Sequence, residues 1–212
     1  MNRKKRLQAI IDVFEREQPI PETELHFESS YQLIVAVILS AQCTDVRVNK
    51  ITPDFYKAFP DADVLATASE AEIFEKIKSC SYPNNKAKNL KNMAITLLEK
   101  FGGKLPEDPE QMQELPGVGR KTAHVLASVL FRQNVLAVDT HVQRVSVRLG
   151  LAPGAKTPLA VERKLVEIAP SETLHNLHHW LILHGRYICK ARKPLCNKCP
   201  VVEFCTYKLK TT

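Results

Sequence analysis

Apolar residues recur at helical spacing along nearly the whole chain. In residues 3–17 (RKKRLQAIIDVFERE) most apolar positions fall three or four apart, which places them on one face of a helix. The apolar run from Leu33 to Leu39 (LIVAVIL) predicts a buried helix over about residues 31–42. No stretch sustains the alternation of apolar and polar residues that marks a strand. The pattern therefore predicts an all-α protein.

Capping residues predict where the helices begin. Ser29 and Ser30 can cap the buried helix, Asp45 can cap the next one, and Ser69 with Glu72 forms a capping-box pattern. The predicted helices, nine or ten in all, cover residues 3–17, 31–42, 45–59, 70–78, 86–101, 109–115, 120–132, 140–149, 158–168 and 172–188.

The length and charge of the chain narrow the classes of protein that it can belong to. A chain of 212 residues suits one large domain or two compact lobes, with candidate boundaries at Gln133-Asn134 and Pro153-Gly154. The formal net charge of +7 favours a polyanionic partner such as nucleic acid. The apolar run LIVAVIL is too short to span a bilayer, and the N-terminal segment has no apolar stretch of the kind found in secretory signals. We therefore expect a cytosolic chain.

The six cysteines fall into two groups. Cys43 and Cys80 are isolated, whereas four others lie within 17 residues, at positions Cys189, Cys196, Cys199 and Cys205. Disulfide scaffolds are typical of small secreted proteins, so the C-terminal group is predicted to bind metal. Four thiolates suit either zinc or a [4Fe–4S] cluster, and the number of ligands does not separate the two.

Residues 109–132 predict a helix, a tight turn and a second helix, with LPGVGRKT at the turn. Glycine permits such a turn and lets a ligand approach the backbone closely. The amides of Val118, Gly119 and Arg120 are expected to point outward at a helix N-terminus, which favours an anion such as a nucleic-acid phosphate. A plain joint between packed helices is the alternative, and the basic residues that follow favour phosphate binding.

Lys121 has two interpretations, as a further phosphate contact or as a nucleophile. A lysine amine attacks only when it is neutral, which desolvation or neighbouring positive charge favours. Asp139 is predicted to cap the helix that begins at Thr140, and a capping carboxylate can still assist proton transfer or stabilise positive charge. Sequence spacing leaves the choice open, although a lysine and an aspartate beside a nucleic-acid backbone suggest chemistry at the sugar carbon that bears the base.

Four stretches together resemble the endonuclease III family of helix-hairpin-helix DNA glycosylases. They are LPGVGRKTA, VDTHVQRVSVRLGL, HHWLILHGRYIC and the terminal cysteine array, and the resemblance covers nearly the whole chain. It implies a two-lobed all-α fold with DNA bound in a cleft between the lobes. Residues 22–133 would form a six-helix barrel, and residues 1–21 with 134–212 would form a domain that carries an iron–sulfur cluster.

The resemblance also implies an activity and its catalytic residues. Lys121 would attack C1′ of a damaged nucleotide, displace an oxidised pyrimidine, and form a Schiff base that promotes β-elimination of the 3′ phosphate. Asp139 would be the second catalytic group. The target nucleotide must leave the base stack, at a cost of roughly a few kcal/mol. The cysteine spacing x6-x2-x5 matches the family and implies a [4Fe–4S] cluster, which staples a basic loop. The family's partner is double-stranded DNA with damaged pyrimidines or abasic sites, bound by a monomer.

Further DNA contacts follow from the same resemblance. Gln42 would fill the gap left by the flipped nucleotide. The family often has glycine and leucine where this chain has Ser81 and Tyr82, so the wedge at Tyr82 is aromatic and can stack on a base. The remaining expected contacts are Asp45, Asn84, Leu115, Gly117, Val118, Gly119, Arg120, Thr140, His141, Arg144, Lys190, Arg192 and Lys193.

Two other functions compete with this one. A monofunctional adenine or mismatch glycosylase of the same superfamily would use water in place of the amine, and that branch usually lacks the lysine found here at position 121. A non-catalytic DNA-binding protein would use only the hairpin and the basic loop, which leaves the pairing of Lys121 with Asp139 unexplained.

Histidines crowd the stretch from 175 to 184. His175 and His179 lie one helical turn apart and could bind a metal, but no third ligand is evident. We predict that they and their neighbours His178 and His184 are surface or packing residues, and that Trp180 belongs to the core.

Overall fold

The computed structural model describes residues 1–211, and the chain divides into two compact units. The discontinuous unit consists of Met1–Thr23 and the segment from Arg132 onward, and the continuous unit is Glu24–Phe131. The chain therefore passes from one unit to the other twice.

The predicted domain boundaries lie close to these changeovers. The sequence placed them at residues 21–22 and 133–134, within two residues of each observed position. The second changeover is beside Gln133-Asn134 and not at Pro153-Gly154. That the units are a six-helix barrel and an iron–sulfur domain stays a prediction.

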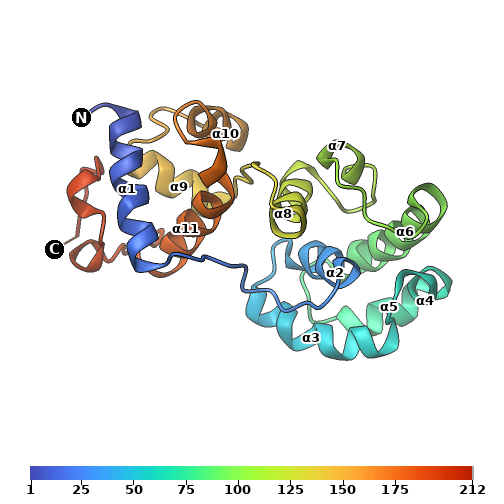
Figure 1. Cartoon of the computed structure of the whole chain (residues 1–212). Helices are drawn as coiled ribbons and strands as arrows, with labels where there is room; N and C mark the ends of the chain where they lie inside the picture. The colour runs from blue at the N-terminus through green and yellow to red at the C-terminus, as the bar shows by residue number, and fades with distance from the viewer. Residues whose placement is uncertain (212) are drawn as a thin grey trace. The chain divides into compact units, whose positions relative to one another are not determined.

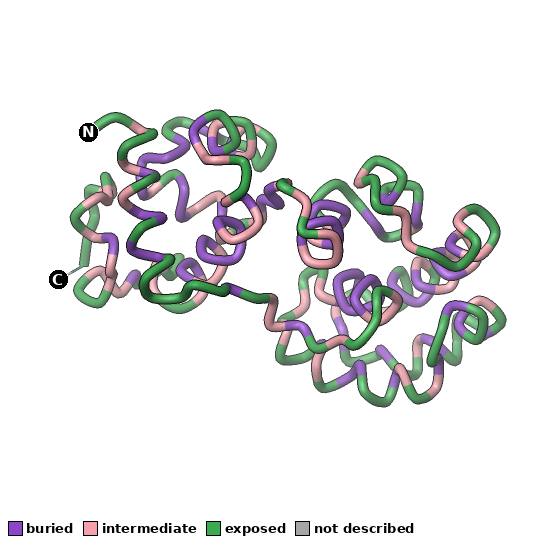
Figure 2. Tube along the Cα trace, in the orientation of Figure 1, coloured by how far each residue is buried: buried purple, intermediate pink, exposed green. Residues whose placement is uncertain are grey.

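Four α-helices and three 3₁₀ helices make up the discontinuous unit among residues 1–211 (Figure 1). They are α1 (Arg3–Glu17), α9 (Thr140–Arg148), α10 (Pro158–Val166), α11 (Leu174–Tyr187) and the 3₁₀ segments Ser171–Thr173, Cys196–Lys198 and Val202–Phe204. Each α-helix turns its apolar face to one shared core, visible as buried segments in Figure 2. Phe14 packs on Trp180 there, with 6.0 Å between ring centroids. Trp180 is 2% exposed, which confirms it as a core residue.

Seven α-helices form the continuous unit. They are α2 (Ser30–Ser40), α3 (Asp45–Ala58), α4 (Ala62–Thr67), α5 (Glu70–Ile77), α6 (Pro83–Phe101), α7 (Pro109–Met112) and α8 (Arg120–Phe131). Helix α2 contacts α3, α6 and α8. Because its residues Leu33 to Leu39 are apolar all round, every one of them is buried. The buried helix predicted from this run is confirmed.

Residues 1–211 contain helices and connecting loops and no strand, so the all-α fold is confirmed. The prediction of nine or ten helices is wrong, because the described chain has eleven α-helices. The missed helix is α4, which has six residues and buries only Ala62 and Leu65, too few to show a period. Its N-cap is Asp61, whose carboxylate accepts from the Val64 amide at 2.9 Å.

Several helix ends also differ from prediction. Helix α2 ends at Ser40 and not at residue 42, because Gln42 has a φ of 54°, outside the helical range. Helix α6 begins at Pro83, three residues before the predicted start. The N-cap of α3 is Thr44, whose hydroxyl accepts from the Arg47 amide at 3.3 Å, so the prediction that Asp45 caps this helix is wrong. None of the described helices is long and apolar enough to cross a membrane.

The histidines of α11 are packing residues. The burial of one of them, His179, should make the stability of the fold depend on pH. His179 is 4% exposed, and burial lowers its pKa to about 3, helped by His178. The unfolded chain takes up a proton at this position below pH about 6.5, whereas the folded chain does not until about pH 3. The free energy of unfolding should therefore fall by about 2–3 kcal/mol between pH 6.5 and 4.5.

Denaturant titrations at these two pH values, on the wild type and on His179→Leu, measure this loss. The leucine variant should lose less stability over the same interval. An equal loss in both proteins would contradict the assignment to His179.

Candidate functional site

Two glycines shape the turn between α7 and α8, and they do so for different reasons. Gly117 has a φ of 85°, and a Cβ placed on it would lie 3.1 Å from Asn89 Cβ and 3.4 Å from Ile38 Cγ2. Both the backbone and the packing therefore require glycine there. A Cβ on Gly119 would meet no atom within 4 Å. Packing would therefore allow a side chain at position 119. Glycine at this position leaves the start of α8 open to a ligand.

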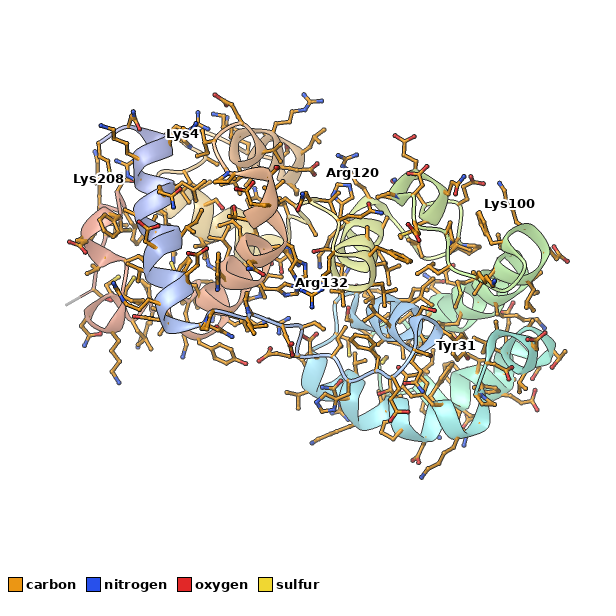
Figure 3. All side chains as sticks on the ribbon, viewed as in Figure 1. Lys4, Tyr31, Lys100, Arg120, Arg132 and Lys208 are labelled. Carbon is orange, nitrogen blue, oxygen red and sulfur yellow. The ribbon has the colours of Figure 1, made fainter. Side chains whose placement is uncertain are left out.

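The N-terminus of α8 presents a positive surface. The Gly119 carbonyl accepts from the Ala123 amide at 2.9 Å, which begins the helical ladder. Arg120, labelled at this end of α8 in Figure 3, and Lys121 occupy the first turn, and both residues are exposed. First-turn amides have no acceptor within the helix, and the helix dipole is positive at this end. The turn therefore suits an anion such as a phosphate.

One part of the predicted phosphate site is wrong. The Val118 amide donates to the Leu115 carbonyl at 3.0 Å and does not point outward. The side chains of Leu115 and Val118 are 1% and 5% exposed, so they anchor the turn in the core. That the amides of the residues after Val118 bind an anion stays a prediction.

Two turns of the continuous unit bring Gln42 and Tyr82 onto neighbouring backbone. The Ser81 hydroxyl donates to the Gln42 carbonyl at 2.5 Å. Gln42 and Tyr82 both have a φ of 54°, a left-handed conformation that is uncommon for residues other than glycine. Tyr82 is 61% exposed, and Gln42 is exposed as well. The predicted gap-filling residue and the predicted wedge therefore share one surface.

Lys86 holds these turns from inside the unit, and sequence reasoning missed it. The side chain is buried, and Nζ donates to the carbonyls of Leu39 at 2.7 Å and Ala41 at 2.8 Å. These bonds satisfy carbonyls at the C-terminal end of α2, which lack helical partners. Burial lowers the pKa of Lys86. The sequence does contain one indication that Lys86 is buried. Lys86 stands four residues before Leu90 and seven before Met93, which places it on the apolar face of α6.

Asp139 caps α9, as predicted. Its Oδ1 accepts from the Val142 amide at 2.8 Å, and the residue is half-buried. The cap needs only one carboxylate oxygen. Thr140, which follows, is exposed. Asp139 belongs to the discontinuous unit and Lys121 to the continuous unit.

Arg144 fastens α9 to the end of α11. Its Nε donates to the Cys189 carbonyl at 3.1 Å and its Nη2 to the Gly185 carbonyl at 2.8 Å. Glycine at 185 is required, because a Cβ there would lie 2.9 Å from His141 Cβ. Sequence reasoning did not single out Gly185. That His141 and Arg144 contact DNA stays a prediction, and the contacts seen for the guanidinium are to backbone.

Arg148, one turn further along α9, was also missed. Its guanidinium donates to the carbonyls of Lys190 at 2.8 Å and Ala191 at 2.9 Å, and it lies 3.5 Å from Cys189 Sγ. The guanidinium also stacks 4.5 Å from the ring centroid of Tyr207. Arg148 therefore shapes the loop after Cys189. Its spacing of four from Arg144, on one face of α9, was the signal in the sequence.

The four C-terminal cysteines line one pocket of the discontinuous unit. The pocket is lined by Cys189, Cys196, Cys199 and Cys205 together with apolar residues such as Ile188 and Leu195. All four are free thiols. Among residues 1–211, no three His, Cys, Asp or Glu side chains are grouped as a single metal ion would require. Four thiols around one pocket match the number of ligands of a [4Fe–4S] cluster.

The surroundings of these thiols fit thiolates stabilised by a bound cation. Burial raises the pKa of Cys199 to about 11 and also raises that of Cys205, so a thiolate here needs positive charge from a metal. A backbone donor and a histidine ring nitrogen lie close to the sulfurs as well. The Tyr207 amide donates to Cys205 Sγ at 3.4 Å, and His184 Nε2 lies 3.7 Å from Cys199 Sγ.

The loop after Cys189 carries the predicted basic contacts. Lys190, Arg192 and Lys193 are all exposed, while the next residue of the loop, Pro194, is buried. In the continuous unit, Asn84 is exposed in the first turn of α6. The described structure thus leaves these side chains accessible to a nucleic acid.

A groove of about 830 Å³ runs beside α9 in the discontinuous unit. Its lining includes Thr140, Arg144 and Arg148 from α9 and Lys208 from the C-terminal segment, which Figure 3 labels. The basic lining suits a phosphate backbone. Sequence reasoning assigned no role to Lys208.

Two protein families match this chain, and proteins of similar sequence are known. Residues 35–171 match the HhH-GPD superfamily base excision DNA repair proteins, and residues 189–205 match the iron–sulfur binding domain of endonuclease III. The endonuclease III of Rickettsia prowazekii (strain Madrid E) is 43% identical over 205 residues, which cover 97% of this chain and 96% of that protein. The endonuclease III of Escherichia coli (strain K12) is 43% identical over 210 residues, which cover 99% of each chain.

Solved structures are similar over the same span. A trapped endonuclease III–DNA covalent intermediate, in an estranged-adenine complex, matches with a TM-score of 0.92 and 38% identity, covering 97% of each chain. A non-covalent endonuclease III–DNA complex matches with a TM-score of 0.92 and 37% identity, covering 97% of this chain and 96% of that chain. A thermostable thymine-DNA glycosylase at 24% identity, with a TM-score of 0.84 and 97% and 96% of the two chains covered, shares the fold.

Proposed function

This chain belongs to the endonuclease III family, and from that premise we propose how its residues carry out base-excision repair of DNA. It is a DNA glycosylase and a DNA-(apurinic or apyrimidinic site) lyase that binds DNA, and it carries a [4Fe–4S] cluster. Its substrates are oxidised pyrimidines and abasic sites in double-stranded DNA. It acts as a monomer in the cytosol.

The observation that carries the catalytic assignment is the position of Lys121. Lys121 lies in the exposed first turn of α8, two residues after Gly119, a glycine that packing does not require. A phosphate bound by the first-turn amides would fix the DNA backbone beside this amine. Arg120 and the positive end of the helix add positive charge beside this amine, which attracts the DNA backbone to it.

The lysine performs both chemical steps. The neutral Nζ of Lys121 attacks C1′, and the glycosidic C–N bond breaks with its electron pair leaving on the base. Opening of the sugar ring yields an imine between Nζ and C1′. Loss of a proton from C2′ then expels the 3′ phosphate as C3′–O breaks, which cleaves the strand by β-elimination.

Asp139 supports these steps from the N-terminus of α9. Its carboxylate stabilises positive charge as the base departs and assists the proton transfers around the imine. The hydrogen bond that Asp139 accepts from the Val142 amide holds this half-buried side chain in one orientation. A fixed carboxylate loses little entropy on reaching the transition state.

The DNA contacts divide into two groups by their chemistry. Those of the first group hold the phosphate backbone, through Gly117, Gly119, Arg120, Thr140, Lys190, Arg192 and Lys193. In the second group, Gln42 fills the gap left by the flipped nucleotide and Tyr82 stacks as the wedge. The shared surface of Gln42 and Tyr82 supports this division.

Cys189, Cys196, Cys199 and Cys205 hold the [4Fe–4S] cluster. When it is bound, the cluster supplies a rigid cross-link among four thiolates. Arg148 and Arg144 connect this part of the chain to α9, which Asp139 caps. The cluster domain therefore positions the basic loop for DNA and leaves the reaction at C1′ to the amine.

Assay of a duplex that contains thymine glycol tests the proposed activity. We expect release of the base together with strand cleavage on the 3′ side of the lesion. An abasic duplex should be cleaved as well. Base release without strand cleavage would contradict the lyase and favour a monofunctional glycosylase, and DNA binding without either product would favour the non-catalytic alternative.

A further inference from the structure

Two thiols outside the cysteine array meet beside the proposed DNA-reading surface. Cys43 and Cys80 are 37 residues apart in the chain, yet their Sγ atoms lie 3.9 Å apart. Cys43 follows Gln42, and Cys80 stands two residues before Tyr82. Neither thiol lines the pocket of the C-terminal cysteines.

The two thiols differ in accessibility. Cys80 is 5% exposed, whereas Cys43 is half-buried, so water and small oxidants reach Cys43 more readily. Burial raises the pKa of Cys80 to about 11, while the cations Lys86 and Arg47 oppose that rise. These two cations are the local source of stabilisation for a thiolate. The arrangement is that of a half-buried, more accessible attacking thiol next to a buried resolving thiol.

The rest of the contact network connects both turns. Ser81 donates to the Gln42 carbonyl, and Lys86 donates to the Ala41 carbonyl at 2.8 Å. These bonds already hold the turns in register, so a covalent bond between the thiols needs a local closure and no refolding of a helix. An S–S bond of about 2.05 Å requires the sulfurs to approach by almost 2 Å.

We propose that Cys43 and Cys80 form a redox modification site, in which a peroxide converts the dithiol to an intramolecular disulfide. The Cys43 thiolate attacks one peroxide oxygen, the O–O bond breaks, and Cys43 becomes a sulfenic acid as one water leaves. The Cys80 sulfur attacks the sulfenic sulfur, and the second water leaves as S–S forms. Two thiols are oxidised by two electrons, and one hydrogen peroxide is reduced to two waters. A dithiol reductant reverses the reaction by exchange.

The disulfide alters the surface on which DNA is read, a consequence that rests on the proposed function. Gln42 and Tyr82 already occupy left-handed backbone conformations, which persist only where the surroundings enforce them. Drawing the turns together displaces both side chains. Cleavage of a lesion duplex should fall at least about tenfold, because an ångström-scale misplacement costs up to ~100-fold in rate.

The test oxidises the cluster-loaded protein with one equivalent of hydrogen peroxide. Peptide mass mapping should show a peptide pair joined through Cys43 and Cys80, separated again by dithiothreitol, and the lesion-cleavage rate should fall and recover with it. Cys43→Ala and Cys80→Ala should form no such pair, and their cleavage rates should resist the oxidant. The visible absorbance of the cluster, followed in every sample, reports damage at the other cysteines.

The outcomes separate the parts of this proposal. If both thiols still react with an alkylating reagent after oxidation, the proposed modification site is wrong. Formation of the disulfide with an unchanged cleavage rate, or an equal loss of rate in Cys43→Ala, would overturn its effect on DNA. A protein that forms the disulfide but never cleaves lesion DNA, even when reduced, would retain the modification site and refute the proposed function.

Discussion

Replacing Lys121 with glutamine should abolish covalent trapping on DNA. Borohydride reduces the imine between Nζ and C1′ to a stable amine, so the wild type incubated with thymine-glycol duplex should yield a crosslinked adduct. The glutamine side chain has similar reach but cannot form an imine. Strand cleavage should fall by a factor on the order of 10³ or more, as expected when a nucleophile is removed.

A matched variant separates the nucleophile from the general positive charge. Lys76→Gln removes one charge from an exposed position on α5 of the same unit and should trap as the wild type does. Affinity of Lys121→Gln for undamaged duplex should change only slightly, because one phosphate contact among many is removed at most. An undiminished yield of adduct from Lys121→Gln would refute the catalytic assignment.

Replacing Cys199 with alanine should remove the cluster and destabilise the discontinuous unit. The thiol is half-buried in the cysteine pocket beside His184, so no water-exposed side chain can substitute for it. Binding of a structural metal group is coupled to folding, and we expect a loss of several kcal/mol in the free energy of unfolding, typical of a lost metal site. Iron analysis, visible absorbance and thermal unfolding measure the result.

The effect should extend to DNA through the basic loop. Arg148 and Cys189 shape the start of that loop, so loss of the cluster should weaken binding to undamaged duplex and reduce its dependence on salt. Cys43→Ala, in the continuous unit, is the matched control and should retain full iron. Wild-type protein purified without oxygen that contains stoichiometric zinc and no iron would show that the cofactor assignment is wrong.

Helix positions were predictable where many residues repeat one pattern. The fifteen residues of α1 and the apolar run in α2 predicted helices at the right places. Burial of one face leaves a helical period in the sequence, and burial of all faces leaves a continuous apolar run. The six residues of α4 are too few for a period, and its cap at Asp61 resembles many loop aspartates. Helix ends were missed where a single backbone angle decides, as at Gln42.

Candidate site residues could be proposed from the sequence where the chemistry lies in contiguous residues. The turn before Lys121, the cap at Asp139 and the spacing of the C-terminal cysteines all occupy short motifs. Lys86 and Arg148 were missed, because their partners are carbonyls 47 and 42 residues away. A backbone carbonyl exists at every position, so sequence gives no sign of which one a side chain will reach.

The sequence by itself determined the helical class, the family and the chemical groups that the protein brings to DNA. These depend on periodicity and on motifs, both of which are local properties of the chain. Only the tertiary structure decided that Gly117 is a packing glycine while Gly119 is not, that the Val118 amide is engaged internally, and that Cys43 meets Cys80. Each of these depends on atoms that folding brings within a few ångströms across long stretches of chain, and distance in space is a property that residue order does not encode directly.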